Sequence, residues 1–243
     1  MNAYTKNTPI QAVIHDPAFG DYGRLIFPVD EGYMSGDTLG SLRLTWYNNI
    51  DPDKTVEIAN FLRTRALNGE TIFYDIYTEE EKAADPAKRD SGLFFFKGTP
   101  GARFAVCNAG GGFAYVGAMQ DSFPHALELS KRGYNAFALI YRPGAFGEED
   151  LPRPAAVALQ YTGHAEYTPE DPPTFACVGE SDWIANWRTM ERRLQALQDL
   201  GIPTEFHHYP GLPHGFGLGT GTVAEGWLDE AVAFWEAQRA PQS

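Results

Sequence analysis

A histidine in a glycine-rich loop near the end of the chain is the first candidate for chemistry. His214 stands in the run Leu-Pro-His-Gly-Phe-Gly, between a strand-like segment and the last amphipathic segment. A histidine on such a loop can reach a substrate and exchange protons near neutral pH. The remaining histidines have no such setting, so we take them as ordinary surface or core residues. The sequence therefore predicts that His214 acts as a general base.

An acidic residue precedes this histidine by 32 positions and has a comparable setting. Asp182 ends the run Gly-Glu-Ser-Asp, directly after the apolar residues 174–179. An aspartate there can cap a following helix, and it can also orient a catalytic imidazole and stabilise its protonated form. The two roles are compatible. We expect the Asp182 carboxylate and the His214 imidazole to meet at one edge of a sheet, with both groups open to solvent.

Three consecutive glycines form the third candidate feature. Gly110, Gly111 and Gly112 follow the apolar residues 104–108. Glycines at this position let the backbone approach a ligand and turn its N–H groups toward it, which suits an oxyanion hole. A tight strand-to-helix turn is the alternative. The position between a strand and a helix favours the oxyanion hole, with Gly111 and Gly112 as donors and Gly110 shaping the loop.

Alternating apolar strands and amphipathic helices must position these residues. The strands are predicted at 71–77, 93–97, 104–108, 136–141, 155–160, 174–179 and 204–209, and the second and third of them are predicted to pair. Helices are predicted at 53–67, 122–132 and 183–200, and a last one after a capping box at 222–225. This alternation predicts an α/β protein with a mostly parallel, doubly wound sheet and helices on both faces.

The first part of the chain has a different amino-acid composition. Residues 1–70 are rich in glycine, aspartate and aromatic side chains. We interpret them as an N-terminal extension or cap that packs on a core formed by residues 71–243 and that could cover a pocket or a partner subunit.

Composition excludes several classes of function. The 243 residues carry a net charge of −13, which disfavours binding to nucleic acid or to anionic membrane surfaces. No apolar run has the length of a membrane helix or the form of a signal peptide. Cys107 and Cys177 lie in apolar runs without metal-site spacing, which indicates buried, reduced thiols and a cytoplasmic protein. We expect a small-molecule substrate and neither metal nor organic cofactor. The oligomeric state stays open.

Four motifs together resemble those of a known superfamily. They are Asn-Ala-Gly-Gly-Gly-Phe at 108–113, Ile-Tyr-Arg-Pro-Gly at 140–144, Gly-Glu-Ser-Asp at 179–182 and Pro-His-Gly-Phe at 213–216. In this combination the chain resembles an α/β hydrolase of the esterase and acetyl-esterase type, from residue 71 onward. The resemblance implies hydrolysis of short acyl esters by a Ser-His-Asp mechanism, with Asp182, His214 and the oxyanion loop of Gly110, Gly111 and Gly112. Asn108 stands where the family usually has histidine.

The nucleophile of such a mechanism is missing from the sequence. Neither Gly-x-Ser-x-Gly nor Gly-x-Cys-x-Gly occurs in it. Compared with the family, a unit of roughly 50 to 60 residues, which would hold the nucleophile elbow and a central strand, is absent between Ala145 and Phe146. Poor substitutes for the nucleophile are Ser181, Ser122, Ser130 and Cys107.

Three explanations fit this absence. The sequence omits a segment, the protein is a truncated relative without its central strand, or the scaffold binds an ester-like ligand without cleaving it. The functional alternatives are accordingly a carboxylesterase and a non-catalytic binding or interaction protein. A peptidase of the prolyl-oligopeptidase type shares the order of the triad, but nothing near the N-terminus resembles a propeller.

Overall fold

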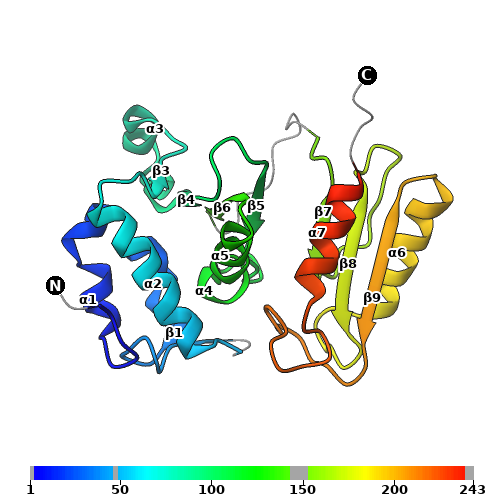
Figure 1. Ribbon diagram of the computed structural model, residues 1–243, viewed down its shortest axis with the longest axis horizontal. Coiled ribbons are helices and arrows are strands. Elements are labelled where there is room, and N and C mark those ends of the chain that lie inside the picture. Colours follow the sequence, from blue (N-terminus) through cyan, green and yellow to red (C-terminus); the bar gives the residue numbers. More distant parts are fainter. Residues whose placement is uncertain (1–2, 46–48, 143–152, 239–243) are drawn as a thin grey trace. The chain divides into compact units, whose positions relative to one another are not determined.

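The computed structural model describes residues 3–45, 49–142 and 153–238 (Figure 1). The chain divides into two compact units, Met1–Gly147 and Glu148–Ser243, which are described separately. The predicted junction at Ala145 and Phe146 lies outside the described residues. The missing elbow segment and the loss of a central strand therefore stay predictions, as does a domain boundary at residue 70.

The first unit combines N-terminal helices with a four-stranded sheet of order β3-β4-β6-β5. Its helices are α1 (Ile10–Ile14), α2 (Pro52–Leu67), α3 (Glu79–Ala84), α4 (Ala118–Asp121) and α5 (Phe123–Lys131), with 3-10 turns at Pro17–Ile26, Glu31–Tyr33 and Pro86–Asp90. Its strands are β1 (Met34–Ser35), β2 (Arg43–Leu44), β3 (Phe73–Tyr74), β4 (Gly92–Phe96), β5 (Phe104–Asn108) and β6 (Asn135–Ile140). The short strands β1 and β2 form a separate antiparallel ladder.

The predicted pairing of β4 with β5 is wrong. Strand β6 lies between them, antiparallel to β4 and parallel to β5. The chain leaves β5, passes through α4 and α5, and returns as β6 alongside β5, which is the usual crossover for parallel strands. A short Gly-Thr-Pro-Gly linker resembles a hairpin turn, but it does not fix which strands pair.

Aromatic side chains join the N-terminal helices to this sheet. Phe94 and Phe96 of β4 are fully buried and pack against Phe123 of α5, with ring centroids 5.1 and 5.7 Å away. Phe61 of α2 stacks on Phe96 at 5.4 Å. The N-terminal segment therefore shares one core with β4 and α5.

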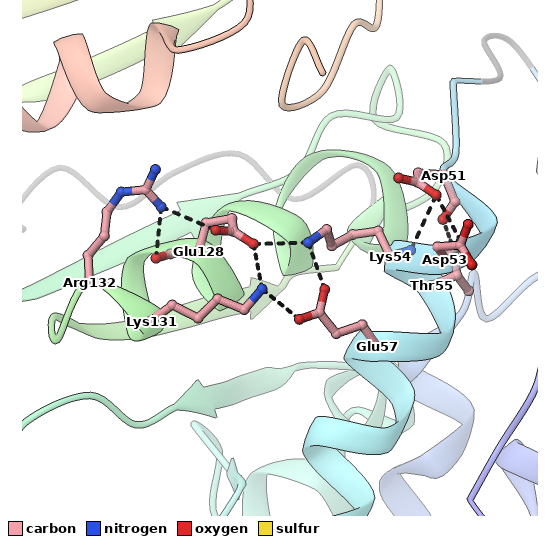
Figure 2. Close-up of polar contacts among 8 residues, drawn as sticks. All are labelled: Asp51, Asp53, Lys54, Thr55, Glu57, Glu128, Lys131 and Arg132. Carbon is pink, nitrogen blue, oxygen red and sulfur yellow. Dashed lines mark hydrogen bonds and ion pairs between the residues drawn. The ribbon is translucent and has the colours of Figure 1, made fainter. Parts of the chain in front are cut away.

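A network of crossed ion pairs also connects α2 with α5 (Figure 2). Lys54 of α2 contacts Glu128 of α5 at 2.9 Å, and Lys131 of α5 contacts Glu57 of α2 at 2.6 Å. Lys54 also pairs with Glu57, and Lys131 with Glu128. Because each carboxylate meets a cation of both helices, the network fixes how α2 sits along α5.

This network makes stability depend on acid pH. Burial works against ionisation of Glu128, but hydrogen bonds from Lys131 and Lys54 outweigh it and lower the pKa of this carboxyl from 4.5 to about 2. A depressed folded-state pKa gives stability that is present above pH 4.5 and lost as pH falls toward 2. We expect Glu128→Gln to lower the free energy of unfolding by about 1–3 kcal/mol at pH 7, and by much less near pH 2.

Urea unfolding at pH 7 and near pH 2 measures this difference, with Glu191→Gln as the matched control, since Glu191 is exposed on a helix of the second unit. A destabilisation by Glu128→Gln that is the same at both pH values contradicts the electrostatic explanation.

The second unit is a parallel three-stranded sheet of order β7-β8-β9. Its elements are β7 (Val157–Gln160), β8 (Thr174–Gly179), α6 (Trp187–Asp199), β9 (Thr204–Tyr209) and α7 (Trp227–Ala237). Every residue of the central strand β8 is buried. On β9, His207 contacts Glu230 of α7, and the next residue, His208, stacks on Trp187 of α6. Successive strand residues face opposite sides, so α6 and α7 cover opposite faces.

Two helix starts differ from the sequence prediction. Helix α6 begins at Trp187 with Asn186 as its cap, not at residue 183. The predicted capping box at 222–225 forms a turn instead, where Glu225 accepts a hydrogen bond from the N–H of Gly221. The last helix begins only after Gly226, at φ 97°. Polar residues with capping-box spacing are also common in turns, because they satisfy backbone N–H groups there as well.

Candidate functional site

His214 and Asp182 lie in direct contact in the second unit. The Nδ1 atom of His214 is 2.7 Å from the Oδ2 atom of Asp182. An ionised carboxylate can only accept a hydrogen bond, so the hydrogen lies on Nδ1 and the lone pair of the neutral ring lies on Nε2. Nε2 is therefore the atom that can take a proton from a reacting group.

The second carboxylate oxygen fixes Asp182 to the backbone. Its Oδ1 atom accepts hydrogen bonds from the N–H groups of Ile184 and Ala185, at 2.8 and 2.7 Å. The aspartate thus caps a turn ahead of α6, whereas Asn186 caps the helix itself. Both oxygens are held in place, one by backbone and one by the imidazole.

The expectation that both groups are open to solvent is wrong. The Asp182 side chain is 0% exposed, and the His214 side chain is 9% exposed. Two backbone N–H groups and the imidazole replace the water that the carboxylate loses. In a base–acid pair only the imidazole has to meet a substrate, so burial of the orienting carboxylate is compatible with that role.

A glycine at the end of β8 allows the acid and the base to meet. A Cβ atom at Gly179 would lie 2.0 Å from the carbonyl oxygen of Leu212, in the loop that carries the histidine. Beyond the strand, the N–H of Glu180 donates to Tyr209 and that of Ser181 donates to Leu212, at 2.9 and 3.1 Å. The first glycine of the Gly-Glu-Ser-Asp motif therefore permits the close approach of the histidine loop.

The far side of the histidine loop is anchored to two further elements. The carbonyl oxygen of Gly217 accepts a hydrogen bond from the indole N–H of Trp227, the first residue of α7, at 3.0 Å. It also accepts one from the side-chain amide of Gln160, the last residue of β7. Gly215 and Gly217 have φ values of 76° and 52°, which only glycine adopts readily. The loop is thus a fixed part of the sheet end.

Sequence analysis missed one residue that packs on the histidine. The ring of Tyr161, directly after β7, lies 4.8 Å from the His214 ring and 4.9 Å from that of Phe216, between centroids. Tyr161 is buried and has a φ of 38°. The sequence places Tyr161 just after a predicted strand. Because the carboxyl ends of parallel strands gather at one edge of the sheet, this position indicates that Tyr161 lies near His214.

The glycine loop belongs to the first unit. The carbonyl of Gly110 accepts a hydrogen bond from Gly117 at 2.9 Å, which closes the loop, and that of Gly111 accepts one from Ala114 at 3.0 Å. A Cβ atom at Gly111 would lie 1.9 Å from the carbonyl oxygen of Tyr115. Within the described parts of the chain, the N–H groups of Gly111 and Gly112 donate no hydrogen bond. Gly112 is exposed, whereas Gly111 is buried.

The substitutes for a nucleophile are poor in the structure as well. The Ser122 side chain is fully buried, and the Ser130 hydroxyl donates to the carbonyl of Lys97 at 2.7 Å. Cys107 is half-buried and not buried as predicted, and the loss of solvent around its thiol raises the pKa to about 12, which keeps it protonated. Ser181 is exposed beside Asp182 in the same turn.

In residues 3–45, 49–142 and 153–238, no group of three or more His, Cys, Asp or Glu side chains is placed to hold a metal ion. No helix in these ranges is both long and apolar enough to cross a membrane.

Several solved structures have a similar fold. An acetyl ester-xyloside bifunctional hydrolase from Caldicellulosiruptor lactoaceticus is 16% identical, with a TM-score of 0.52 over 60% of this chain and 88% of that one. An α/β hydrolase from a Medee basin deep-sea metagenome library is 18% identical, with a TM-score of 0.50 over 61% and 92%. Thermogutta terrifontis esterase 2, phosphorylated by paraoxon, is 16% identical, with a TM-score of 0.51 over 63% and 91%.

Comparison by sequence finds no counterpart. No family model matches the chain, and no curated protein does. At such low identities the structural likeness concerns the fold alone. What the described residues share with these hydrolases is their architecture: the chain has the fold of the α/β hydrolases.

Proposed function

We propose that the protein is a carboxylic ester hydrolase that acts on short acyl esters by a Ser-His-Asp-type mechanism. The observation that supports this most is the 2.7 Å contact between His214 and the buried carboxylate of Asp182, at the carboxyl end of a parallel sheet. In this proposal His214 is the general base and Asp182 orients it. Gly111 and Gly112 donate N–H groups to the oxyanion, and Gly110 shapes their loop.

The proposed reaction has two halves. His214 takes the proton of the nucleophilic hydroxyl as its oxygen attacks the acyl carbon, and the backbone N–H groups stabilise the negative oxygen that forms. The imidazolium then gives the proton to the leaving alcohol. In the second half water takes the place of the alcohol, and His214 takes a proton from it as its oxygen attacks the acyl carbon. The bond between the acyl carbon and the nucleophile oxygen then breaks, the imidazolium returns the proton to that oxygen, and the carboxylic acid is released.

The nucleophile is the part of this proposal to which no residue is assigned. The sequence has no Gly-x-Ser-x-Gly, and Ser122, Ser130, Ser181 and Cys107 are poor candidates. This observation favours a second candidate function, a non-catalytic protein that binds an ester-like ligand on the same scaffold. The two functions share a fold and differ in whether a serine reacts.

Replacement of the proposed base tests the first function. We expect His214→Ala to lower kcat/KM for p-nitrophenyl acetate by about 10²–10⁴, the usual contribution of a general base. The matched control is His208→Ala, since His208 also pairs with a carboxylate, Glu180, at 2.6 Å. We expect the control to keep nearly full activity. Equal hydrolysis by the wild type and both variants contradicts the role of His214.

A fluorophosphonate probe separates the two functions, because it bonds covalently to an activated serine. Labelling that disappears in His214→Ala supports the hydrolase and identifies its nucleophile by peptide mapping. Absence of labelling and of ester hydrolysis supports the binding protein. The intact mass of the purified protein shows in addition whether Ala145 is joined directly to Phe146.

A further inference from the structure

A small cavity in the first unit lies beside the glycine loop. Its volume is about 190 Å³. Its walls come from the N-terminal segment with Val29 and Asp30, from Asp90 ahead of β4, from Ala114 and Val116 after the glycine loop, and from the end of β6 with the next residue, Tyr141. The N-terminal segment therefore supplies part of the wall of this cavity.

Two hydrogen bonds connect this cavity to the glycine loop. The hydroxyl of Tyr141, in the cavity wall, donates to the carbonyl of Ala109 at 2.9 Å, directly before Gly110. The N–H of Ala114, also in the wall, donates to Gly111 at 3.0 Å. A group bound in the cavity is thus held next to the backbone that presents the N–H groups of Gly111 and Gly112.

The size and the chemistry of the walls restrict what fits. A cavity of about 150 Å³ lined by apolar side chains holds a benzene-sized ligand, so about 190 Å³ has room for a short acyl chain or one ring. Most wall residues are apolar, and Val116 and Ile140 are buried. A compact apolar group therefore fits better than a long chain.

The charges at the cavity are negative. Asp90 is paired with Arg24, but Asp30 accepts its hydrogen bond from the backbone N–H of Gly32, and none of the described residues that line the wall is cationic. An anionic ligand would meet the Asp30 carboxylate without a compensating cation. An uncharged group is therefore preferred.

We propose that this cavity is the acyl-binding pocket of the enzyme, which accepts uncharged acyl groups of about four to six carbons and rejects acyl groups that carry a carboxylate. The assignment of the cavity to acyl groups rests on the proposed function, because it presupposes that the substrate is an ester. The binding preference itself concerns only residues of the first unit, so it can be measured without turnover.

Two amides of nearly equal size, pentanamide and the anionic succinamate, are suitable probes because amides resist hydrolysis. We expect pentanamide to bind with a Kd on the order of 1 mM, as suits about seven non-hydrogen atoms. It should shift the backbone N–H signals of Val29, Val116 and Tyr141 in a ¹H–¹⁵N spectrum. Succinamate should bind at least about 5-fold more weakly, and Asp30→Asn should remove most of that difference.

Two variants of one wall residue test the location. Val116→Phe fills the cavity and should weaken pentanamide at least about 10-fold, whereas the same change at Val106, which is exposed on β5 and outside the wall, should not. If Val116→Phe does not fold, Val116→Ala tests the same location. This variant enlarges the cavity, so the binding preference should shift from pentanamide toward heptanamide.

The outcomes separate this inference from the proposed function. Binding with the expected preferences supports the pocket, even in a protein that hydrolyses no ester. Ester hydrolysis that depends on His214, together with pentanamide binding that is absent or insensitive to Val116→Phe and Val116→Ala, overturns the pocket and leaves the proposed function intact. Equal affinity for both amides overturns its charge selectivity.

Discussion

Asp182→Asn is expected to lower kcat for p-nitrophenyl acetate by about 10³–10⁴ with little change in KM. The amide oxygen of the new side chain must still accept the two N–H groups of Ile184 and Ala185, so its NH₂ group faces Nδ1 of His214. A donor at that place stabilises the imidazole tautomer with its hydrogen on Nε2. That tautomer presents a donor to the nucleophile and cannot take its proton.

The same change has a readout that is independent of turnover. The ¹⁵N chemical shifts of the His214 ring distinguish the two tautomers, and we expect them to exchange places in the variant. Glu180→Gln is the matched control, because it alters the carboxylate that pairs with His208, at 2.6 Å, just beyond the same strand. Unchanged tautomer and unchanged kcat in Asp182→Asn exclude the orienting role.

Asp16→Ala is expected to lower the free energy of unfolding by about 3–5 kcal/mol. The Asp16 carboxylate accepts hydrogen bonds from Arg63 at 2.7 Å, from the Tyr4 hydroxyl at 2.6 Å and from the N–H of Ala18 at 2.9 Å. Only 8% of the Arg63 side chain and 7% of that of Asp16 are exposed. The substitution removes the negative charge of Asp16, while the positively charged guanidinium of Arg63 stays buried.

Urea unfolding at pH 7 measures this loss. Asp53→Ala is the control, because its ion pair with Lys6 is exposed, and we expect it to cost less than about 1 kcal/mol. The double variant Asp16→Leu with Arg63→Met should recover much of the stability, since it leaves no buried charge. A similar small loss for Asp16→Ala and Asp53→Ala refutes the importance of burial here.

The sequence predicted the second unit better than the first. Strands at 174–179 and 204–209 were predicted with the bounds that the structure has. The first is a continuous apolar run, which is typical of a buried parallel strand. In the first unit, the linker between β4 and β5 suggested a hairpin, yet β6 separates them. Strand order depends on a crossover connection and on packing with α5, which no local pattern encodes.

The candidate site was predictable in part for a related reason. His214 and Asp182 stand in loops after strands, and the ends of parallel strands converge whatever the details of packing. Their contact follows from this rule. Tyr161 was missed because an aromatic residue after a strand is common, and its ring reaches His214 only through a rare backbone conformation. Burial of the acid was missed because it depends on two backbone N–H groups in the next turn.

The double anchoring of the Gly217 carbonyl has a consequence for motion. A displacement of Gly217 would break two hydrogen bonds together, one to the Trp227 indole at the start of α7 and one to the Gln160 amide at the end of β7. Thermal fluctuations of the segment are thereby coupled to those of its sheet and its last helix. The loop that carries His214 is therefore tied to the sheet and to the last helix, and it has less freedom than is usual for a glycine-rich connection.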